Sequence, residues 1–329
     1  MNEKICEIIT KLSKESQNQK LRLFAKLDLN TKLEIFNNHK IIFYNLKNIH
    51  KNKDTENSIL SYCAFLLSLD NFQKNTTEET IKIIKFKKMK QPKARKKEKC
   101  FLVEGPRMFF EIPKDRIEEC YLTEEFEDKY AEELKGWHYE LISENVCKHL
   151  SDTKTPQGVI AVVRRTEPSI EELLHKEKNP CFFLLENLQD PGNLGTIVRT
   201  AEGAGVTGII MNRETVDIYN PKVIRSTMGA IFRVPFVIAD SLPEVIFQLK
   251  QNGVSVYAGH LKGDVFYKQD YRDGSAFLIG NEGNGLTDEI TALADHKIKI
   301  PMKGKVESLN AAVSATILMY ETMRQREFM

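Results

Sequence analysis

The sequence predicts an α/β protein whose C-terminal part is built on a mostly parallel sheet. From Pro180 onward, short and fully apolar runs alternate with segments of helical periodicity. This pattern is typical of strands that are buried between helices on both faces of a sheet. A smaller segment with its own β-branched strand precedes this region, and the first 80 residues contain neither Gly nor Pro. A chain of 329 residues is therefore expected to hold more than one domain.

The composition excludes several classes of protein. Lys and Arg number 48 and Asp and Glu 46, so binding of nucleic acid would depend on a local basic patch rather than on the net charge of +2. No run approaches the ~20 apolar residues that span a bilayer, and the N-terminus does not resemble a secretory signal. The six cysteines are spread singly without a CxxC pair, which argues against a metal site. We expect a cytoplasmic protein with no membrane and no metal partner.

Four parts follow one another along the chain. Residues 1–80 show apolar positions at three- and four-residue spacing and are expected to form a helical N-terminal extension. Residues 81–165 are expected to form a small α/β domain that binds the substrate. Residues 166–179 are polar and are interpreted as a linker, and residues 180–329 as the domain with the parallel sheet.

The elements of this last domain are read from apolar runs and the segments between them. The expected strands are 181–186, 208–211, 234–238, 254–258, 276–280 and 297–300. The expected helices are 193–203, 221–230, 242–252, 286–294 and 308–326. Within the last helix, Leu309, Val313, Ile317 and Tyr320 are expected to form the buried stripe, with Ser308 as the cap.

A run of basic residues opens the second part of the chain. Residues 82–99 hold ten Lys or Arg and one Glu, and we single out Lys93, Arg95, Lys96 and Lys97. A short strand follows, and then a turn at Glu104 and Gly105. A basic arm directly before a small α/β domain would suit a phosphate backbone. These four basic residues, with Glu104 and Gly105 of the adjoining turn, are therefore predicted to contact nucleic acid. A solvated tail of like charges is the alternative that remains open.

A formal GxGxxG pattern at residues 203–208 does not predict a dinucleotide site. Such a loop follows a strand and opens a helix, so that the helix N-terminus meets the pyrophosphate. Here the glycines follow an expected helix and precede an expected strand. We expect them to end the helix and turn the chain into the sheet.

Three separated segments gather polar residues and glycines at the ends of expected strands. In the first, a helix begins near Asn193 and places Arg199 about 200° from Ile197, away from the buried stripe. The second runs from a strand ending at Ile279 into a loop with Gly280 and Glu282. Each segment by itself also fits an ordinary turn or a capped helix.

The third segment contains Ile300, Pro301 and Met302, followed by Ser308, Leu309 and Asn310. In order and spacing, the three segments together resemble the motifs of the SpoU/TrmH family in the SPOUT superfamily of RNA methyltransferases. The matching positions are Asn193, Gly195 and Arg199; Gly280, Glu282 and Gly285; and Ile300 to Met302 with Ser308 to Asn310. The resemblance covers residues 180–329, and the second part of the chain resembles the family's ribosomal-protein-like substrate domain.

The resemblance implies a fold, a reaction and partners. It implies a deep trefoil knot in the parallel-sheet domain, S-adenosylmethionine as methyl donor, and a ribose 2′-hydroxyl as acceptor, most often in ribosomal RNA. It implies a homodimer. The donor would be held by Ile279, Gly280, Ile300, Met302 and Leu309, together with Thr227 from a small-residue segment at 226–235.

The catalytic group implied by the resemblance comprises Asn193, Arg199, Glu282, Ser308 and Asn310. Because a guanidinium stays protonated in proteins, we assign Arg199 as a clamp on the phosphate rather than as a base. Asn193 would orient Arg199 or the ribose. The alternatives are an RNA-binding protein of the same fold without activity, an enzyme that acts on tRNA or confers antibiotic resistance, and a base-methylating relative.

Overall fold

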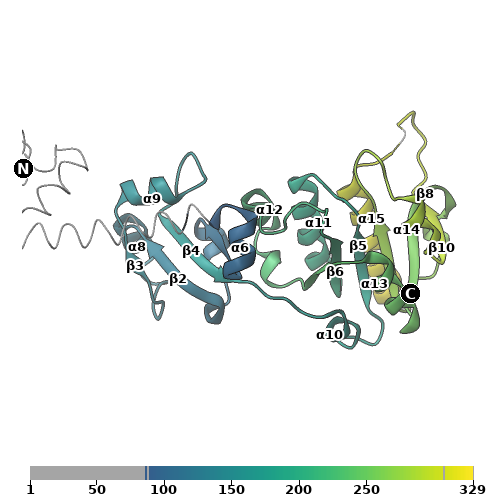
Figure 1. The fold of residues 1–329 in the computed structure, drawn as a ribbon, viewed down its shortest axis with the longest axis horizontal. Helices are drawn as coiled ribbons and strands as arrows, with labels where there is room; N and C mark the ends of the chain where they lie inside the picture. Colours follow the sequence, from purple (N-terminus) through teal and green to yellow (C-terminus); the bar gives the residue numbers. More distant parts are fainter. Residues whose placement is uncertain (1–85, 87–88, 307, 329) are drawn as a thin grey trace, which may run out of the picture. The chain divides into compact units, whose positions relative to one another are not determined.

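The computed structural model describes residues 86, 89–306 and 308–328 (Figure 1). They belong to the second of the chain's two units, Ile83–Met329. The helical extension predicted over residues 1–80 lies outside the described residues. The described part contains two β-sheets, and its elements bear the labels of Figure 1.

The first sheet has four strands in the order β1-β4-β2-β3. Its strands are β1 (Cys100–Glu104), β2 (Ile117–Leu122), β3 (Glu140–Leu141) and β4 (Val159–Arg164). The elements around it are α6 (Pro92–Glu98), α7 (Pro106–Phe109), η1 (Lys114–Arg116), α8 (Glu124–Lys129) and α9 (Glu144–Leu150). β4 is antiparallel to both of its neighbours, and β2 and β3 are parallel. The β-branched run of β4 lies at the centre because it can pack on both faces of the sheet.

The second sheet has six strands, all parallel, in the order β10-β8-β9-β5-β6-β7. The strands are β5 (Cys181–Leu185), β6 (Gly208–Asn212), β7 (Phe236–Ala239), β8 (Ser255–Val265), β9 (Ser275–Ile279) and β10 (His296–Lys299). The parallel sheet predicted from the apolar runs is confirmed, and each expected strand overlaps an observed one. β8 is longer than expected because its second half continues as polar residues.

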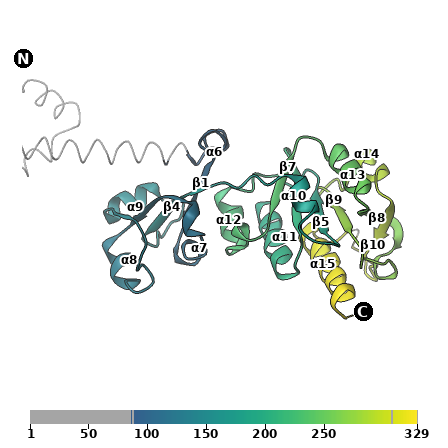
Figure 2. The ribbon, with the colours of Figure 1, turned by 90° about the horizontal axis from the view of Figure 1, so that it is seen from below.

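Helices cover both faces of this sheet (Figures 1 and 2). They are α10 (Ile170–Leu174), α11 (Pro191–Gly203), α12 (Pro221–Thr227), α13 (Leu242–Gln251), α14 (Asp288–Ala292) and α15 (Ala311–Phe328), with the short turns η2 (Ala230–Phe232) and η3 (Phe266–Lys268). One face packs against α11, α12 and α15 through Phe183, Leu185 and Phe277. The other packs against α10, α13 and α14 through Phe182, Leu184 and Leu278. Adjacent strand residues alternate between the two cores, as the pleat requires.

The small sheet shares a core with the larger one. The same apolar cluster contains Phe101 and Val103 of β1 and the inner residues of α11 and α12. The ring of Phe101 lies 4.7 Å from that of Tyr219, between centroids. Arg233 pairs with both Glu111 and Glu202, which links the small domain to α11. The two sheets are therefore joined by packing as well as by the linker.

The glycines of the GxGxxG pattern end a helix, as predicted. α11 ends at Gly203, Gly205 has a φ of 66°, and β6 begins at Gly208. The left-handed φ favours glycine at this turn because it has no Cβ. The glycines therefore have the place that the sequence predicts for them, after a helix and before a strand.

Two expectations about α15 are wrong. The cap is Asn310, whose Oδ1 accepts hydrogen bonds from the backbone of Ala312 and Val313, and not Ser308. The buried stripe consists of Ala311, Ala312, Ala315, Leu318 and Met319. Val313 and Tyr320 of the predicted stripe are 47% and 48% exposed. The helix turns its small residues inward because it packs against α11, where short side chains let two helices come close.

Arg326 near the end of α15 is expected to stabilise the fold. Its guanidinium donates hydrogen bonds to the carbonyls of Asn179, Tyr271 and Asp273, at 2.7 to 2.9 Å. The change Arg326→Met leaves these acceptors without a charged donor and should lower the free energy of unfolding by about 2–4 kcal/mol in urea denaturation. Arg324→Met removes a half-exposed guanidinium that pairs with Glu321 on the same helix, and it should cost less than about 1 kcal/mol. Equal effects of both changes would contradict this role.

The buried cysteines are inert thiols in the structure. Burial raises the pKa of Cys120 to about 12 and those of Cys147 and Cys181 to about 11. A thiol with a raised pKa is a poor nucleophile and a poor metal ligand at neutral pH. Within residues 86, 89–306 and 308–328, no helix has the length and apolar character to cross a membrane, and no group of acidic, His or Cys side chains is arranged to hold a metal.

Candidate functional site

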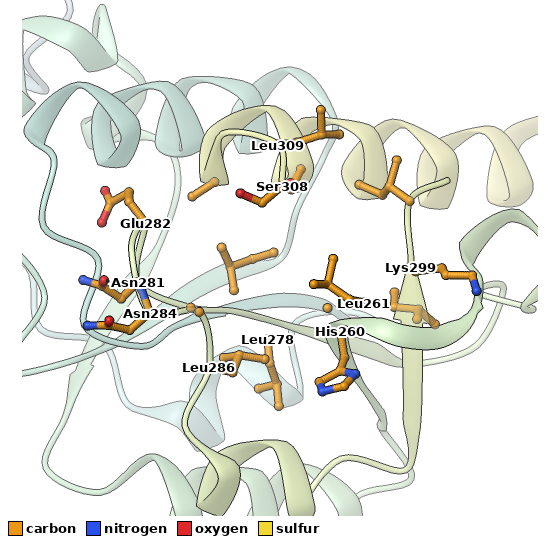
Figure 3. Close-up of a pocket in the computed structure, with 18 of the residues that line it drawn as sticks. His260, Leu261, Leu278, Asn281, Glu282, Asn284, Leu286, Lys299, Ser308 and Leu309 are labelled. Atoms are coloured by element: carbon orange, nitrogen blue, oxygen red, sulfur yellow. Dashed lines mark hydrogen bonds between the residues drawn. The ribbon is translucent and has the colours of Figure 1, made fainter. Parts of the chain in front are cut away.

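A pocket of about 370 Å³ lies at the carboxyl end of the larger sheet. Because Leu185 of β5 pairs with Ile279 of β9, the loops that follow these two strands begin at the same level. Figure 3 shows Ser308 and Leu309 on one wall, Leu278 and Leu286 on the opposite wall, and Glu282 with Asn281 and Asn284 at one end. Segments more than 40 residues apart in sequence therefore form one cavity.

Most of the predicted site residues lie in this pocket. Its walls include all but one of the residues assigned to the donor, namely Ile279, Gly280, Ile300, Met302 and Leu309. Glu282 and Ser308 of the predicted catalytic group line it as well. Asn193 and Asn310 do not line the cavity but are hydrogen-bonded at its end. The three sequence segments are thus brought together in one chain.

Gly280 allows the two sides of the glycine loop to touch. The backbone N–H groups of Asn281 and Gly285 each donate to the other residue's carbonyl, at 3.0 and 2.9 Å. A Cβ on Gly280 would lie 2.1 Å from the carbonyl carbon of Gly285. The close approach of backbone to backbone therefore depends on the missing side chain.

Glu282 is the centre of a hydrogen-bonded chain. Its carboxylate accepts from the Asn193 side chain at 2.9 Å and from the backbone N–H groups of Gln189 and Asp190 at 3.0 and 2.9 Å. Asn310 donates in turn to Oδ1 of Asn193 at 2.9 Å. Partial burial opposes ionisation, but the hydrogen bonds from Asn193, Gln189 and Asp190 prevail and hold the pKa of Glu282 below its ordinary value. The carboxylate is therefore ionised at neutral pH, and it fixes both asparagines.

Glu186 is a site residue that the sequence did not indicate. Its buried carboxylate accepts from the backbone N–H of Thr287 at 2.9 Å and from the Thr287 hydroxyl at 2.7 Å. These bonds anchor the far end of the glycine loop to the end of β5. A single Glu after an apolar strand gives no signal of this role, because its partner is 101 residues away.

His260 and Leu261 of β8 also line the pocket and were missed. The apolar run that predicts this strand ends at residue 258, and the polar residues that continue β8 to Val265 carry no strand signal. Leu261 is 66% exposed at the rim.

Arg199 lies outside the walls of the pocket. It is exposed on α11, while Ile197 and Ala201 of the same helix are buried, as predicted. Within the described part of the chain, its guanidinium has no hydrogen bond or ion pair. The cation is thus available to a ligand that approaches α11 from solvent.

The structure does not bring Thr227 to the pocket. Thr227 is fully buried in α12, where its hydroxyl donates to the carbonyl of Ile224 at 2.7 Å. Its neighbour Ser226 packs against Gly195 of α11. The small residues of this segment serve the contact between α11 and α12, which corrects the assignment of Thr227 to the donor.

The basic run forms α6, and its members differ in exposure. Lys93, Lys96 and Lys97 are exposed, as a surface that binds RNA requires. Arg95 is 4% exposed and pairs with Asp217 at 2.5 Å, so its assignment to RNA binding is corrected. A lone sequence cannot reveal this pair because Asp217 is 122 residues away.

The turn predicted to contact RNA is held by the small domain itself. Glu104 accepts hydrogen bonds from the Ser151 hydroxyl at 2.6 Å and from the backbone of Asp152 at 2.9 Å. Gly105 has a φ of 85° and lies against Gln157. Both residues are half-buried, so they shape the loop at 151–157 rather than offer a free charge.

The fold and the pocket define a methyltransferase of the SpoU type. The profile of the SpoU rRNA Methylase family matches residues 180–320, and that of the MRM3-like substrate binding domain matches residues 79–161. The chain belongs to the SpoU family, as the resemblance of its motifs predicted.

Relatives and solved structures agree with this membership. The chain is 34% identical over 243 residues to the 23S rRNA (guanosine(2553)-2'-O)-methyltransferase RlmP of Bacillus subtilis, covering 73% of this chain and 94% of that protein. It matches the SpoU methyltransferase AviRb from Streptomyces viridochromogenes, solved in complex with AdoMet, with a TM-score of 0.68 and 27% identity over 74% of this chain and 97% of that one. A putative TrmH-family RNA methyltransferase from Porphyromonas gingivalis matches with a TM-score of 0.65 and 28% identity, over 74% and 97%.

The pocket fits S-adenosylmethionine, the methyl donor of SpoU methyltransferases. Its volume is within the range of sites for small molecules. Leu278, Leu286 and Ile298 offer an apolar surface for an aromatic base. Gly280 lets the loop backbone reach the ligand, and backbone groups can supply the polar contacts that these side chains lack.

Proposed function

We propose that this protein transfers a methyl group from S-adenosylmethionine to the 2′-hydroxyl of a ribose in ribosomal RNA. The observation that supports it most is the pocket with the Glu282, Asn193 and Asn310 chain at its end, which unites all three motif segments. The relative RlmP, whose name specifies 2′-O-methylation of 23S rRNA, supports the choice of acceptor and of RNA.

The chain's own residues account for binding and alignment. Gly280, Ile300, Met302 and Leu309 hold the donor, which supplies an activated methyl group. Alignment of the acceptor oxygen with that methyl group contributes a large part of the rate enhancement. We assign this alignment to Asn193 and Asn310, which Glu282 keeps in place, and to Ser308, whose hydroxyl lies on the pocket wall (Figure 3).

Arg199 is assigned to the RNA phosphate next to the reacting ribose. A fixed cation lowers the cost of negative charge that develops on the acceptor oxygen. The proton of the 2′-hydroxyl would leave to water or phosphate, since the guanidinium keeps its own protons.

The test is methyl transfer by the purified protein. Ribosomal RNA and tRNA from cells that lack the gene are incubated with labelled donor, and the modified position is mapped as a 2′-O-methyl nucleotide. We expect a label in ribosomal RNA at one ribose. Label in tRNA alone, or on a base, would show that the proposed acceptor is wrong. Binding of RNA without binding of the donor would show that the protein is an RNA-binding protein and not an enzyme.

The exposed lysines of α6 are proposed to bind the RNA backbone. Changing Lys93, Lys96 and Lys97 together to Glu should weaken RNA binding and reduce the slope of log Kd against log salt by about 2–3, close to one per lost contact. The control is the triple change of the same lysines to Arg, which keeps the charge. An unchanged salt slope in the Glu variant would favour the solvated-tail interpretation.

A homodimer is proposed from the outer face of α15. Val313 and Tyr320 are about half exposed, and Ile317 lies on the same helix with part of its surface open. Apolar side chains at this spacing form a stripe that a second copy could cover. We expect light scattering to give twice the mass of the chain, and Val313→Glu with Tyr320→Glu to give the single mass. A monomeric wild type would contradict the proposal.

Three finer features complete the proposal. The domain boundaries at 81–165, 166–179 and 180–329 are supported by the two family profiles, which match residues 79–161 and 180–320. A trefoil knot is proposed for the C-terminal region, where the segment 280–286 meets Ile300, Met302, Ser308 and Leu309 at one pocket. A cytoplasmic location would suit a ribosomal RNA substrate.

A further inference from the structure

A second cavity, of about 540 Å³, lies beside the edge strand β7. Its walls come from α6, from residues 165–168 where the linker begins, from the end of β6 with the loop at 213–218 that follows it, and from β7 itself. None of these residues lines the pocket assigned to the methyl donor. The reaction assigned above does not use this cavity.

Arg165 gives the cavity a cation that is not fully satisfied. Its guanidinium lies 4.2 Å from the centre of the Tyr219 ring, and its side chain is 11% exposed. The buried Nε has no hydrogen-bond partner in the described part of the chain. Its one carboxylate neighbour, Glu167, is 3.9 Å from Nη2. Buried donors are nearly always paired in proteins, so this guanidinium has fewer partners than is usual for a buried arginine.

The charges around the cavity leave it positive. Lys96, Arg165 and Arg213 line it, against Glu167 and Asp217. Arg213 is paired with Asp240, which does not line the cavity, so Lys96 and Arg165 are the cations that remain. Of the two acids, Asp217 is paired with Arg95, and Glu167 lies 3.5 Å from Lys99; neither Arg95 nor Lys99 lines the cavity. Lys96 is exposed and has no ion pair among the described residues. An anion would therefore be attracted here.

Part of the remaining wall of the cavity is apolar and suits the base of a nucleotide. Phe236, Val216 and Ile238 contribute apolar surface, and Ile238 is 39% exposed. A cationic end beside an apolar wall is the arrangement that holds a nucleotide of single-stranded RNA, with its phosphate on the cations and its base on the wall.

The cavity is connected to the site by hydrogen bonds. The Gln189 side chain donates to the carbonyl of Glu214, in the loop that lines the cavity, at 2.7 Å. The backbone N–H of Gln189 donates to Glu282 at 3.0 Å. The loop that lines the cavity and the end of the donor pocket are thus held by the same residue.

We propose that this cavity binds one nucleotide of the RNA substrate, with its phosphate on Arg165 and Lys96, at a position away from the ribose that is methylated. The proposal rests on the proposed function. It extends the exposed lysines of α6 into a defined binding site, because Lys96 belongs to both.

The test compares Arg165→Met and Lys96→Met with Lys250→Met, a matched loss of one charge on α13, across the sheet from α11. Each of the first two should weaken RNA binding about tenfold and reduce the salt slope by about 1, with donor affinity unchanged. Lys250→Met should match the wild type. Lys96→Met keeps the test valid if Arg165→Met does not fold, because Lys96 is exposed.

Two further arms separate the outcomes. RNAs that carry 4-thiouridine at successive distances from the methylated position are compared. One of the positions away from the methylated ribose should crosslink to the peptide that contains β7, and Lys96→Met should reduce this crosslink. If Arg165→Met and Lys96→Met both bind RNA with wild-type affinity and salt slope, the cavity does not bind the RNA. Methyl transfer by the wild type would still support the proposed function in that case. Tight binding of free uridine monophosphate that depends on Arg165, without any change in RNA affinity, would also overturn it in favour of a small nucleotide. Absence of methyl transfer by the wild type would instead contradict the proposed function.

Discussion

Replacement of Arg199 by alanine is expected to lower the rate of methyl transfer by about 10²–10³-fold, the usual effect of removing one group that stabilises developing charge. Donor affinity should be unchanged because Arg199 does not line the donor pocket. Fold stability should change little, since the side chain is exposed and makes no hydrogen bond or ion pair within the described residues. The measurements are single-turnover transfer at saturating RNA and titration calorimetry with the donor.

The change Arg199→Lys is the control for charge alone. Lysine keeps the positive charge but lacks the planar fork that holds a phosphate by two parallel hydrogen bonds. We expect it to recover part of the lost rate, within about tenfold of the wild type. Near-full turnover of Arg199→Ala on its own RNA would remove Arg199 from the mechanism and leave the pocket intact.

The second large effect is expected from Gly280→Ala. The added Cβ would meet the carbonyl carbon and oxygen of Gly285 at 2.1 and 2.3 Å and the backbone nitrogen of Leu286 at 2.3 Å. Because all three are backbone atoms, the loop has to move as a whole and the two bonds between Asn281 and Gly285 are lost. Donor affinity should fall by about a hundredfold or more in calorimetry, since the loop backbone forms one side of the pocket.

Gly283→Ala is the matched control in the same loop. Its nearest neighbour would be the side-chain oxygen of Asn281 at 3.5 Å, an ordinary contact. We expect donor affinity within about threefold of the wild type. Should both alanine variants bind the donor equally well, the close approach at Gly280 would have no part in binding. Thermal melting of both variants separates a local effect from unfolding.

The strands of the larger sheet and the three motif segments were predictable because their signals are local. Apolar runs identify buried strands, and the spacing from Ile300 to Ser308 is visible in the sequence. The pairs that organise the site are not local. Asn193 meets Asn310 across 117 residues, and Glu186 meets Thr287 across 101. Each of these polar residues is compatible with a solvated turn until the fold supplies its partner.

The errors in α15 and α6 have the same origin. Val313, Ile317 and Tyr320 follow helical spacing just as closely as the residues that are in fact buried. Periodicity alone therefore assigns the larger side chains to the buried face. The helix instead buries Ala312 and Ala315, because its neighbour is another helix at close range. In α6, the charge pattern does not distinguish Arg95 from the lysines around it, although the ion pair with Asp217 holds Arg95 in the interior.

The shared core of the two sheets has a consequence for how RNA is chosen. Phe101 and Val103 of the small sheet and the inner face of α11 belong to one apolar cluster, and Arg233 joins the two halves at its edge. The distance from the lysines of α6 to the donor pocket is therefore fixed by the packing of the two sheets. If the lysines of α6 bind RNA as proposed, the RNA must itself span this distance to present a ribose at the donor pocket.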